Sequence, residues 1–166
     1  MQARLDGKVA LVTGSTQGIG GAIAEEAVRS GAAAILVTGR DPKRGADTVA
    51  KLIGLGARAA FVAAELSDAE TPGRLVGECV RQFGRIDLLV NAAANTDRAS
   101  VLDATLDDWS RLFDINARAP LFLMQAAITA MRAAGRGGAI VNILSMNAHG
   151  GTADLAGYSA TKAALA

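Results

Sequence analysis

The sequence predicts an α/β domain built on a doubly wound parallel sheet. Short apolar runs of strand length alternate with helical stretches along all 166 residues. The runs are continuously apolar rather than alternating, which indicates strands that are buried on both faces. Strands separated by helices form βαβ units, whose right-handed crossovers place helices on both faces of one sheet. Because the chain has no repeat, low-complexity segment or linker, we expect one domain over residues 1–166.

Each element has its own local signal. Strands are expected at 8–13, 33–38, 58–64, 86–91 and 138–145, and helices at 19–30, 41–53, 68–83, 106–134 and from about 154. Gly31 is a stop signal for the first helix, and Asp41-Pro42 is typical of an N-cap followed by proline in the first turn. Pro72 and Gly73 leave the start of the third helix open. Region 106–134 is either one helix or a helix broken near its start.

Composition and charge exclude several classes of protein. The formal net charge is +1, so no basic field attracts nucleic acid or anionic lipid. The single cysteine, Cys79, cannot form an internal disulfide, and we expect it to pack as a small apolar group. The start of the chain lacks a signal peptide, and the longest apolar-rich stretch, 119–131, is too short to span a bilayer. The sequence predicts a cytoplasmic protein without membrane or nucleic-acid partners.

A glycine-rich turn follows the first predicted strand. Gly14, Gly18 and Gly20 stand in the spacing G-x-x-x-G-x-G, directly before a predicted helix. Glycine permits a tight turn, close approach of a pyrophosphate to the backbone, and close helix–strand packing. The phosphates of a nucleotide would then lie at the helix N-terminus, where free N–H groups favour anions. Such turns also occur for purely structural reasons, but the strand–turn–helix context favours nucleotide binding.

Tyr158 and Lys162 form a Y-x-x-x-K pair. Residues four apart on a helix share a face. An ammonium near a phenol stabilises the phenolate form, so such a tyrosine can exchange a proton with a carbonyl or alcohol oxygen near neutral pH. The alternative is a chance pair on a solvated helix. The chain has one tyrosine and four lysines, so this offset arises by chance with a frequency of about 2%.

Together these motifs resemble the single-domain branch of the short-chain dehydrogenase/reductase family. The glycine turn, Asn91-Ala92-Ala93-Ala94, Asn116, Ser145 and the Tyr158–Lys162 pair occur in the family's order and approximate spacing over the whole chain. The resemblance implies a Rossmann-type fold and an oxidoreductase that moves a hydride between a nicotinamide cofactor and a small carbonyl or secondary-alcohol substrate. The alternative is a non-catalytic nucleotide-binding fragment or sensor of the same fold.

The resemblance implies a role for each site residue and no metal. Ser145 would polarise the substrate oxygen, Tyr158 would be the general acid/base, and Lys162 would hold the nicotinamide ribose and tune Tyr158. Asn116 would keep the long helix locally open and position a water; Ser145 could instead simply end a strand, and Asn116 could mark a kink. The residues expected to contact the cofactor are Gly14, Ser15, Thr16, Gln17, Gly18, Ile19, Gly20, Arg40, Glu65, Leu66, Asn91, Ala92, Ala93, Tyr158 and Lys162.

Two positions depart from the family's pattern. Ala94 replaces the last glycine of the usual Asn-Asn-Ala-Gly run, and we expect this smallest of changes to be tolerated. Glu65 stands where the family usually has Asp. Glu65 could accept a hydrogen bond from the adenine amino group or could be a surface charge, and the sequence leaves both open.

The end of the second predicted strand distinguishes NADP from NAD. An acidic residue there would bind the ribose 2′-hydroxyl, whereas arginine accommodates a 2′-phosphate. The expected acidic position holds Gly39, and Arg40 follows, which favours NADP. Gln17 argues against this, because NADP users often carry a second basic residue there. Asp41 could serve the ribose of NAD, the alternative cofactor, although the N-cap role suits it better.

The resemblance also bears on chain length and assembly. Family members have roughly 250 residues, so the chain is expected to be truncated after its catalytic segment, 138–166, with two C-terminal strands and the substrate-binding segment missing. Residues 120–131 are apolar on nearly all sides, which is typical of a helix that is buried all round. One face would cover the sheet and the other would contact a second copy. We therefore expect a homodimer or homotetramer of the complete protein.

Overall fold

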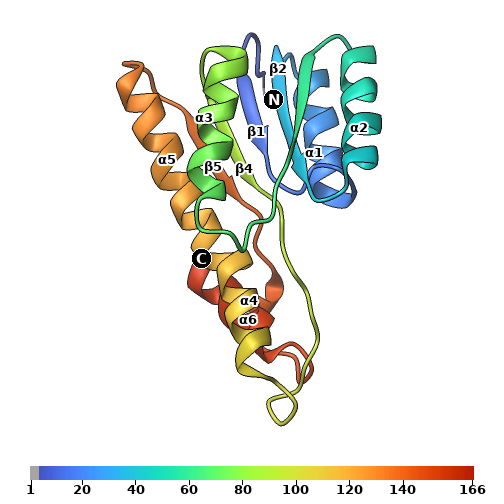
Figure 1. The fold of residues 1–166 in the computed structure, drawn as a ribbon, viewed down its shortest axis with the longest axis vertical. Helices are drawn as coiled ribbons and strands as arrows, with labels where there is room; N and C mark the ends of the chain where they lie inside the picture. Colours follow the sequence, from blue (N-terminus) through green and yellow to red (C-terminus); the bar gives the residue numbers. More distant parts are fainter. Residues whose placement is uncertain (1–3) are drawn as a thin grey trace.

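The computed structural model describes residues 4–166 and contains a five-stranded parallel sheet between layers of helices (Figure 1). The strand order is β3-β2-β1-β4-β5, which confirms the predicted doubly wound α/β fold. The strands are β1 (Val9–Val12), β2 (Ala34–Gly39), β3 (Arg58–Ala63), β4 (Leu88–Asn91) and β5 (Ala139–Asn142). The order reverses at β1, so the first connection leads to one side of the sheet and the connection after β3 leads back across it to β4.

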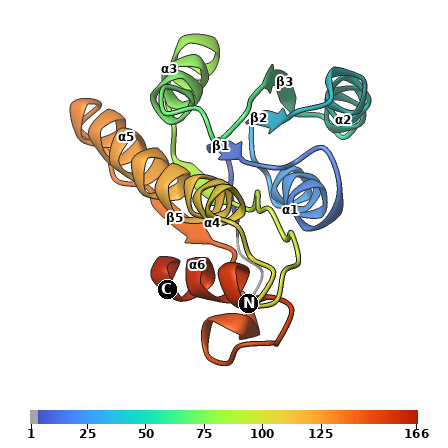
Figure 2. The same ribbon diagram turned by 60° about the horizontal axis from the view of Figure 1, so that its bottom comes forward.

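Helices cover both faces of the sheet (Figure 2). They are α1 (Gly18–Arg29), α2 (Pro42–Gly54), α3 (Thr71–Phe83), α4 (Leu106–Phe113), α5 (Ala119–Ala133) and α6 (Ala156–Leu165). Leu11 and Leu36 pack with α3 and α5, whereas Val12 and Ile35 pack with α1 and α2. Successive strand side chains point to opposite faces. The strands are continuously apolar because each face meets its own layer of helices.

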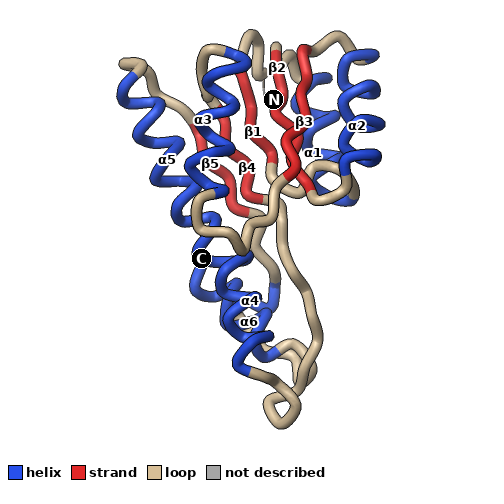
Figure 3. Tube along the Cα trace, in the orientation of Figure 1, coloured by secondary structure: helices blue, strands red, loops and turns tan. Residues whose placement is uncertain are grey.

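The lower part of the molecule extends beyond the sheet (Figure 3). There α6 packs against α4, against a π-helical turn at Asp114–Arg118, and against a short 3₁₀ turn at Met146–Ala148. The loop after β4 joins this part through a parallel bridge between Ala99 and Leu155. These elements follow the carboxyl ends of β4 and β5, which is where ligands bind in open α/β sheets.

Several predicted boundaries differ from the structure. The long region 106–134 is interrupted by the π-helical turn, so the broken alternative is the correct one. The last helix begins at Ala156 rather than near Asp154, because the Asp154 side chain pairs with Arg98 and its carbonyl accepts from the Ala99 N–H. The third helix begins at Thr71, at the proline that fits its first turn. By contrast, Asp41 caps α2 as predicted, accepting from two backbone N–H groups.

The fifth strand is shorter than predicted and has one partner. Its pairing with β4 ends at Asn142, opposite Asn91, and the chain then leaves the sheet three residues before Ser145. In residues 4–166, β5 pairs with β4 alone, and Val141 is 44% exposed. Cys79 is fully buried, as expected. No helix in this part of the chain combines the length and apolar character that crossing a bilayer requires.

Candidate active site

A groove of about 660 Å³ lies at the carboxyl ends of the central strands. It is bounded by the glycine turn after β1, the ends of β2 and β3, and the segment after β4. Most of the predicted cofactor residues line it: Gly14, Thr16, Gln17, Gly18, Ile19, Gly20, Arg40, Glu65, Leu66, Ala92 and Ala93. The topology therefore gathers residues from four separate segments at one edge of the sheet.

The glycine turn needs glycine for two different reasons. Gly14 has a φ of +63°, and a Cβ there would lie 2.8 Å from the Cα of Ala93. At Gly20 a Cβ would lie 2.5 Å from the carbonyl oxygen of Gly14. The first position requires a left-handed backbone and close approach of the β4 segment, and the second lets α1 pack directly on the turn.

The N-terminus of α1 faces this groove without a side-chain cap. Gln17 is the N-cap residue, but its side chain makes no capping hydrogen bond, and the first turn carries no acidic residue. The first N–H groups of a helix have no partner within the helix. The groove therefore offers free donors and the positive end of a helix dipole, which fit the pyrophosphate of a dinucleotide.

Four predicted cofactor residues do not line the groove: Tyr158 and Lys162 on α6, and Ser15 and Asn91 at the strand ends. The Ser15 hydroxyl is buried, donates to the Val12 carbonyl at 2.7 Å and accepts from the Thr38 N–H at 3.1 Å. The Asn91 amide is also buried and donates to Oδ1 of Asn142 at 2.9 Å. Both side chains connect neighbouring strand ends, so they shape the groove without facing it.

Sequence reasoning missed Thr13, the residue that joins β1 to the segment after β4. Its Oγ1 accepts from the N–H groups of Ala92 at 3.1 Å and Ala93 at 3.2 Å. These two bonds hold the Asn91–Ala94 segment against the glycine turn. A hydroxyl at the carboxyl end of a central strand was the available signal, but its partners lie almost 80 residues further along the chain.

Asn116 lies at the centre of the π-helical turn and is fully buried. Its Oδ1 accepts from the Asn95 N–H at 2.8 Å, while Nδ2 donates to the Asn95 carbonyl at 2.8 Å and to Oγ1 of Thr161 at 3.1 Å. One side chain thus joins the loop after β4 to α6. π-turns within α-helices occur frequently at functional sites, and here the turn places an amide between two site segments.

Tyr158 and Lys162 share one face of α6. The Lys162 ammonium lies 5.9 Å from the centre of the Tyr158 ring and donates to the Ile143 carbonyl at 2.7 Å. Lys162 is only 3% exposed, and burial lowers the pKa of its ammonium. Ile143 stands two residues before Ser145, so the lysine ties α6 to the loop after β5.

Ser145 begins the 3₁₀ turn that packs against α6. Its side chain accepts from the Asn147 N–H at 3.2 Å, so it caps this turn. The hydroxyl proton has no acceptor within residues 4–166. A donor is therefore available from this side chain beside the helix that carries Tyr158.

These motifs and this topology have a direct counterpart among known proteins. The sequence profile described as short chain dehydrogenase matches residues 8–166. The chain belongs to the short-chain dehydrogenase family.

Relatives within the family share sequence and structure over nearly the whole chain. The sorbitol dehydrogenase of Cereibacter sphaeroides is 42% identical over 162 residues, which are 98% of this chain and 62% of that protein. A short-chain dehydrogenase from Burkholderia cenocepacia, solved with NADP, superposes with a TM-score of 0.91 at 36% identity, covering 98% of this chain and 65% of that one. A xylitol dehydrogenase solved with NAD⁺ superposes with a TM-score of 0.89 at 30% identity, covering 96% and 61%.

Two facts follow from these similarities. Short-chain dehydrogenases of this kind bind NADP or NAD, since both appear in the similar structures. The chain spans less than two thirds of the length of the family members named above.

Arg40 and Glu65 are exposed and line the groove at the carboxyl ends of the strands. The Arg40 side chain has no ion pair within residues 4–166, so its charge is available to a ligand. Oε1 of Glu65 accepts from the Ser67 N–H at a long 3.4 Å, which leaves both alternatives for Glu65 open. Ala94 also lines the groove, at the position where the family usually has glycine.

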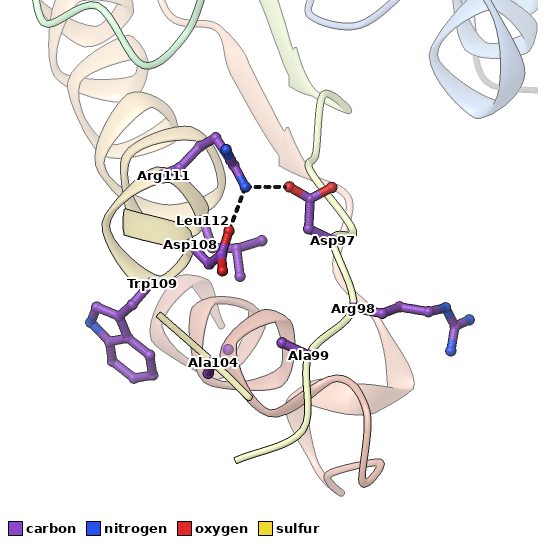
Figure 4. Close-up of a pocket in the computed structure, with 9 residues that line it drawn as sticks. Asp97, Arg98, Ala99, Ala104, Asp108, Trp109, Arg111 and Leu112 are labelled. Carbon is purple, nitrogen blue, oxygen red and sulfur yellow. Dashed lines mark hydrogen bonds and ion pairs between the residues drawn. The ribbon is translucent and has the colours of Figure 1, made fainter. Parts of the chain in front are cut away.

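A second pocket of about 300 Å³ adjoins this groove and shares two residues with it, Asp97 and Arg111 (Figure 4). Arg111 donates from Nη2 to Asp97 at 2.9 Å and to Asp108 at 2.7 Å, which ties the loop after β4 to α4. Arg98 points away from this pocket and pairs with Asp154. Sequence reasoning missed both pairs, which fix the loop that borders the segment between Ser145 and Tyr158.

Proposed function

We propose that the protein carrying this chain is an NADP-dependent oxidoreductase that interconverts a small ketone and the corresponding secondary alcohol. Residues 1–166 would be its nucleotide-binding domain, with the catalytic residues in segment 138–166. The supporting observation is the Tyr158–Lys162 pair, held beside the loop of Ser145 by the bond from Lys162 to the Ile143 carbonyl. A protein that only bound nucleotides could use the lysine but would not need a tyrosine hydroxyl beside it.

The bound nicotinamide cofactor would supply or accept the hydride. In the reductive direction the Tyr158 hydroxyl gives its proton to the substrate oxygen, and in the oxidative direction it takes that proton back. The Ser145 hydroxyl donates a hydrogen bond to the same oxygen and stabilises its developing negative charge. Lys162 would hold the nicotinamide ribose when the cofactor is bound. The Asn116 side chain bonds to both the loop after β4 and α6, and so holds this loop against the helix.

A turnover assay tests this function. The full-length protein would be assayed with NADPH on a panel of ketones and with NADP⁺ on secondary alcohols, including sugar alcohols because relatives are named sorbitol and xylitol dehydrogenases. The same assays with NADH and NAD⁺ measure cofactor preference. Nucleotide binding without turnover on any substrate of the panel would favour the non-catalytic alternative.

Arg40→Ala is expected to weaken NADPH binding by about tenfold or more and to leave NADH binding nearly unchanged. The substitution removes a charge-assisted contact that only the 2′-phosphate would make. Titration by nucleotide fluorescence gives both dissociation constants. Arg136→Ala is a matched control, because Arg136 is an exposed arginine before β5, at the opposite ends of the strands. An unchanged ratio of the two affinities in Arg40→Ala would contradict the proposed cofactor preference.

We also propose that the full-length protein self-associates through α5. Leu123, Ala127 and Met131 of this helix are buried in the core, whereas Leu121, Phe122 and Ile128 are exposed. The exposed apolar face is expected to be covered by a second copy.

Light scattering at micromolar concentration should therefore give a dimer or tetramer, and Phe122→Asp should shift it toward the monomer. Ile53→Asp is a suitable control, since Ile53 is an exposed apolar residue of α2, on the opposite side of the sheet. A monomeric wild-type protein would refute the proposal.

A further inference from the structure

Gln17 of the glycine turn is hydrogen-bonded to an arginine from another element. Its Oε1 accepts from Nη1 of Arg44, the third residue of α2. A second hollow lies between α1 and α2 and is lined in part by Arg44. It shares Thr16, Gln17 and Gly18 with the groove at the carboxyl ends of the strands, which is the proposed cofactor groove. The Gln17 side chain therefore lies between the groove and the Arg44 guanidinium. Arg44 is in the first turn of α2, just after Arg40 in the chain.

Arg44 retains hydrogen-bond donors for an anion. Its Nε lies 3.3 Å from Oδ2 of Asp41 and its Nη1 donates to Gln17, while Nη2 makes no hydrogen bond within residues 4–166. The side chain is 57% exposed. A guanidinium carries five N–H donors in a planar fork that matches phosphate oxygens. A phosphate at the rim of the groove would therefore find unused donors on Arg44.

The same region is poorly suited to a bare ribose 2′-hydroxyl. The Asp41 carboxylate accepts from the N–H groups of Lys43 at 2.9 Å and Arg44 at 3.2 Å, and it also pairs with the Arg44 guanidinium. One oxygen thus caps α2, and the other is engaged in the ion pair with Arg44. A Cβ at Gly39 would lie 2.7 Å from the side chain of Thr16, so a carboxylate at that position would require the Thr16 side chain to move.

We propose that Arg44 is a second arginine for the ribose 2′-phosphate of NADP, and that Gln17 is the positioning residue that holds it. This inference rests on the NADP preference proposed above and adds the residues that read the phosphate. A phosphomonoester carries close to two negative charges at neutral pH, and a single arginine balances only one. Arg40, between β2 and α2, and Arg44, in the first turn of α2, would both donate to its oxygens, Arg44 through the N–H groups that its pair with Asp41 leaves unused. Gln17 stands where NADP users often carry a second basic residue. It would contribute by holding Arg44 rather than by contacting the phosphate itself.

Binding measurements on the full-length protein test this assignment. Calorimetry with adenosine 2′,5′-bisphosphate and with AMP isolates the 2′-phosphate, and fluorescence titration gives the affinities for NADPH and NADH. Arg44→Ala is expected to weaken both 2′-phosphorylated ligands by about tenfold and to leave AMP and NADH unchanged. Gln17→Ala should change the NADPH/NADH ratio in the same direction by less. Arg44→Lys should recover part of the loss, because it keeps the charge without the fork.

Lys43→Ala is the matched control. It removes the same charge one residue earlier in α2, but Lys43 is 86% exposed and pairs with Asp47 at 3.2 Å. Its NADPH/NADH ratio should equal that of the wild type. An equal loss of both cofactors in Arg44→Ala, or the same effect in Lys43→Ala, would overturn the assignment. An unchanged ratio in Arg44→Ala beside a lost preference in Arg40→Ala would overturn it and leave NADP preference standing. A wild type that binds NADH as tightly as NADPH would refute both.

Discussion

Tyr158→Phe in the full-length protein is expected to lower turnover by about 10²–10⁴-fold while NADPH affinity stays close to that of the wild type. The substitution removes the proton donor that the transition state needs and leaves the ring in place. The fold should tolerate it, because the Tyr158 hydroxyl makes no hydrogen bond within residues 4–166. The Tyr158 backbone carbonyl accepts from Oγ1 of Thr161, and the substitution leaves this bond in place.

Steady-state kinetics, NADPH titration and thermal unfolding should be measured on the same preparation. Lys162→Met is a useful comparison, because it removes the bond to the Ile143 carbonyl and the proposed ribose contact together. Lys162→Met should therefore lower both cofactor affinity and turnover, whereas Tyr158→Phe should lower turnover alone. Turnover within a factor of about two of the wild type in Tyr158→Phe would refute the role of the hydroxyl as general acid/base.

Residues 1–166 expressed alone are expected to aggregate and to lack measurable turnover. β5 pairs on one side only within the described chain, so its other side presents unpaired backbone groups beside the exposed Val141 and Leu144. Exposed apolar edge strands promote association between chains. Lys162 also lies only three residues before the end of α6 at Leu165, where helices fray, so the site geometry would be poorly held.

The comparison is between residues 1–166 and the full-length protein, by light scattering, by thermal unfolding with and without NADPH, and by turnover. Val141→Lys provides an internal test of the cause. A charge at the edge should reduce the association of residues 1–166 without restoring turnover. A monodisperse fragment 1–166 whose turnover equals that of the full-length protein would show that the β5 edge needs no cover.

Much of the fold follows from local sequence patterns. Continuous apolar runs such as Ala34–Val37 predicted buried parallel strands, and the Asp41-Pro42 signal predicted the start of α2. Strand ends were predicted less well, because β5 ends where its partner β4 ends, at Asn91. A strand boundary is thus set by pairing with a segment about 50 residues away, which no local pattern contains.

The candidate site likewise contains features that local sequence patterns predict and features that depend on contacts between distant segments. The Tyr158–Lys162 pair and the glycine turn have fixed local spacings, so sequence alone located them. The pairs formed by Gln17 with Arg44, by Asp97 with Arg111 and by Thr13 with the segment after β4 join residues from different elements. Their spacing depends on how loops fold over the sheet, so only the structure brings them together. The roles of Ser15 and Asn91 as strand-end connectors were hidden for the same reason.

The π-helical turn at Asp114–Arg118 has a consequence for how the chain tolerates deletions. Such a turn contains one residue more than an α-helical turn, and each residue rotates a helix by about 100°. α4 is oriented by its contact with α6, and α5 is oriented by the sheet. The additional residue therefore sets the angular phase between α4 and α5, that is, how far α5 is rotated about the helix axis relative to α4. Deleting a single residue here would turn the apolar stripe of α5 off the sheet, whereas the same deletion in the exposed loop before α4 would leave that phase unchanged.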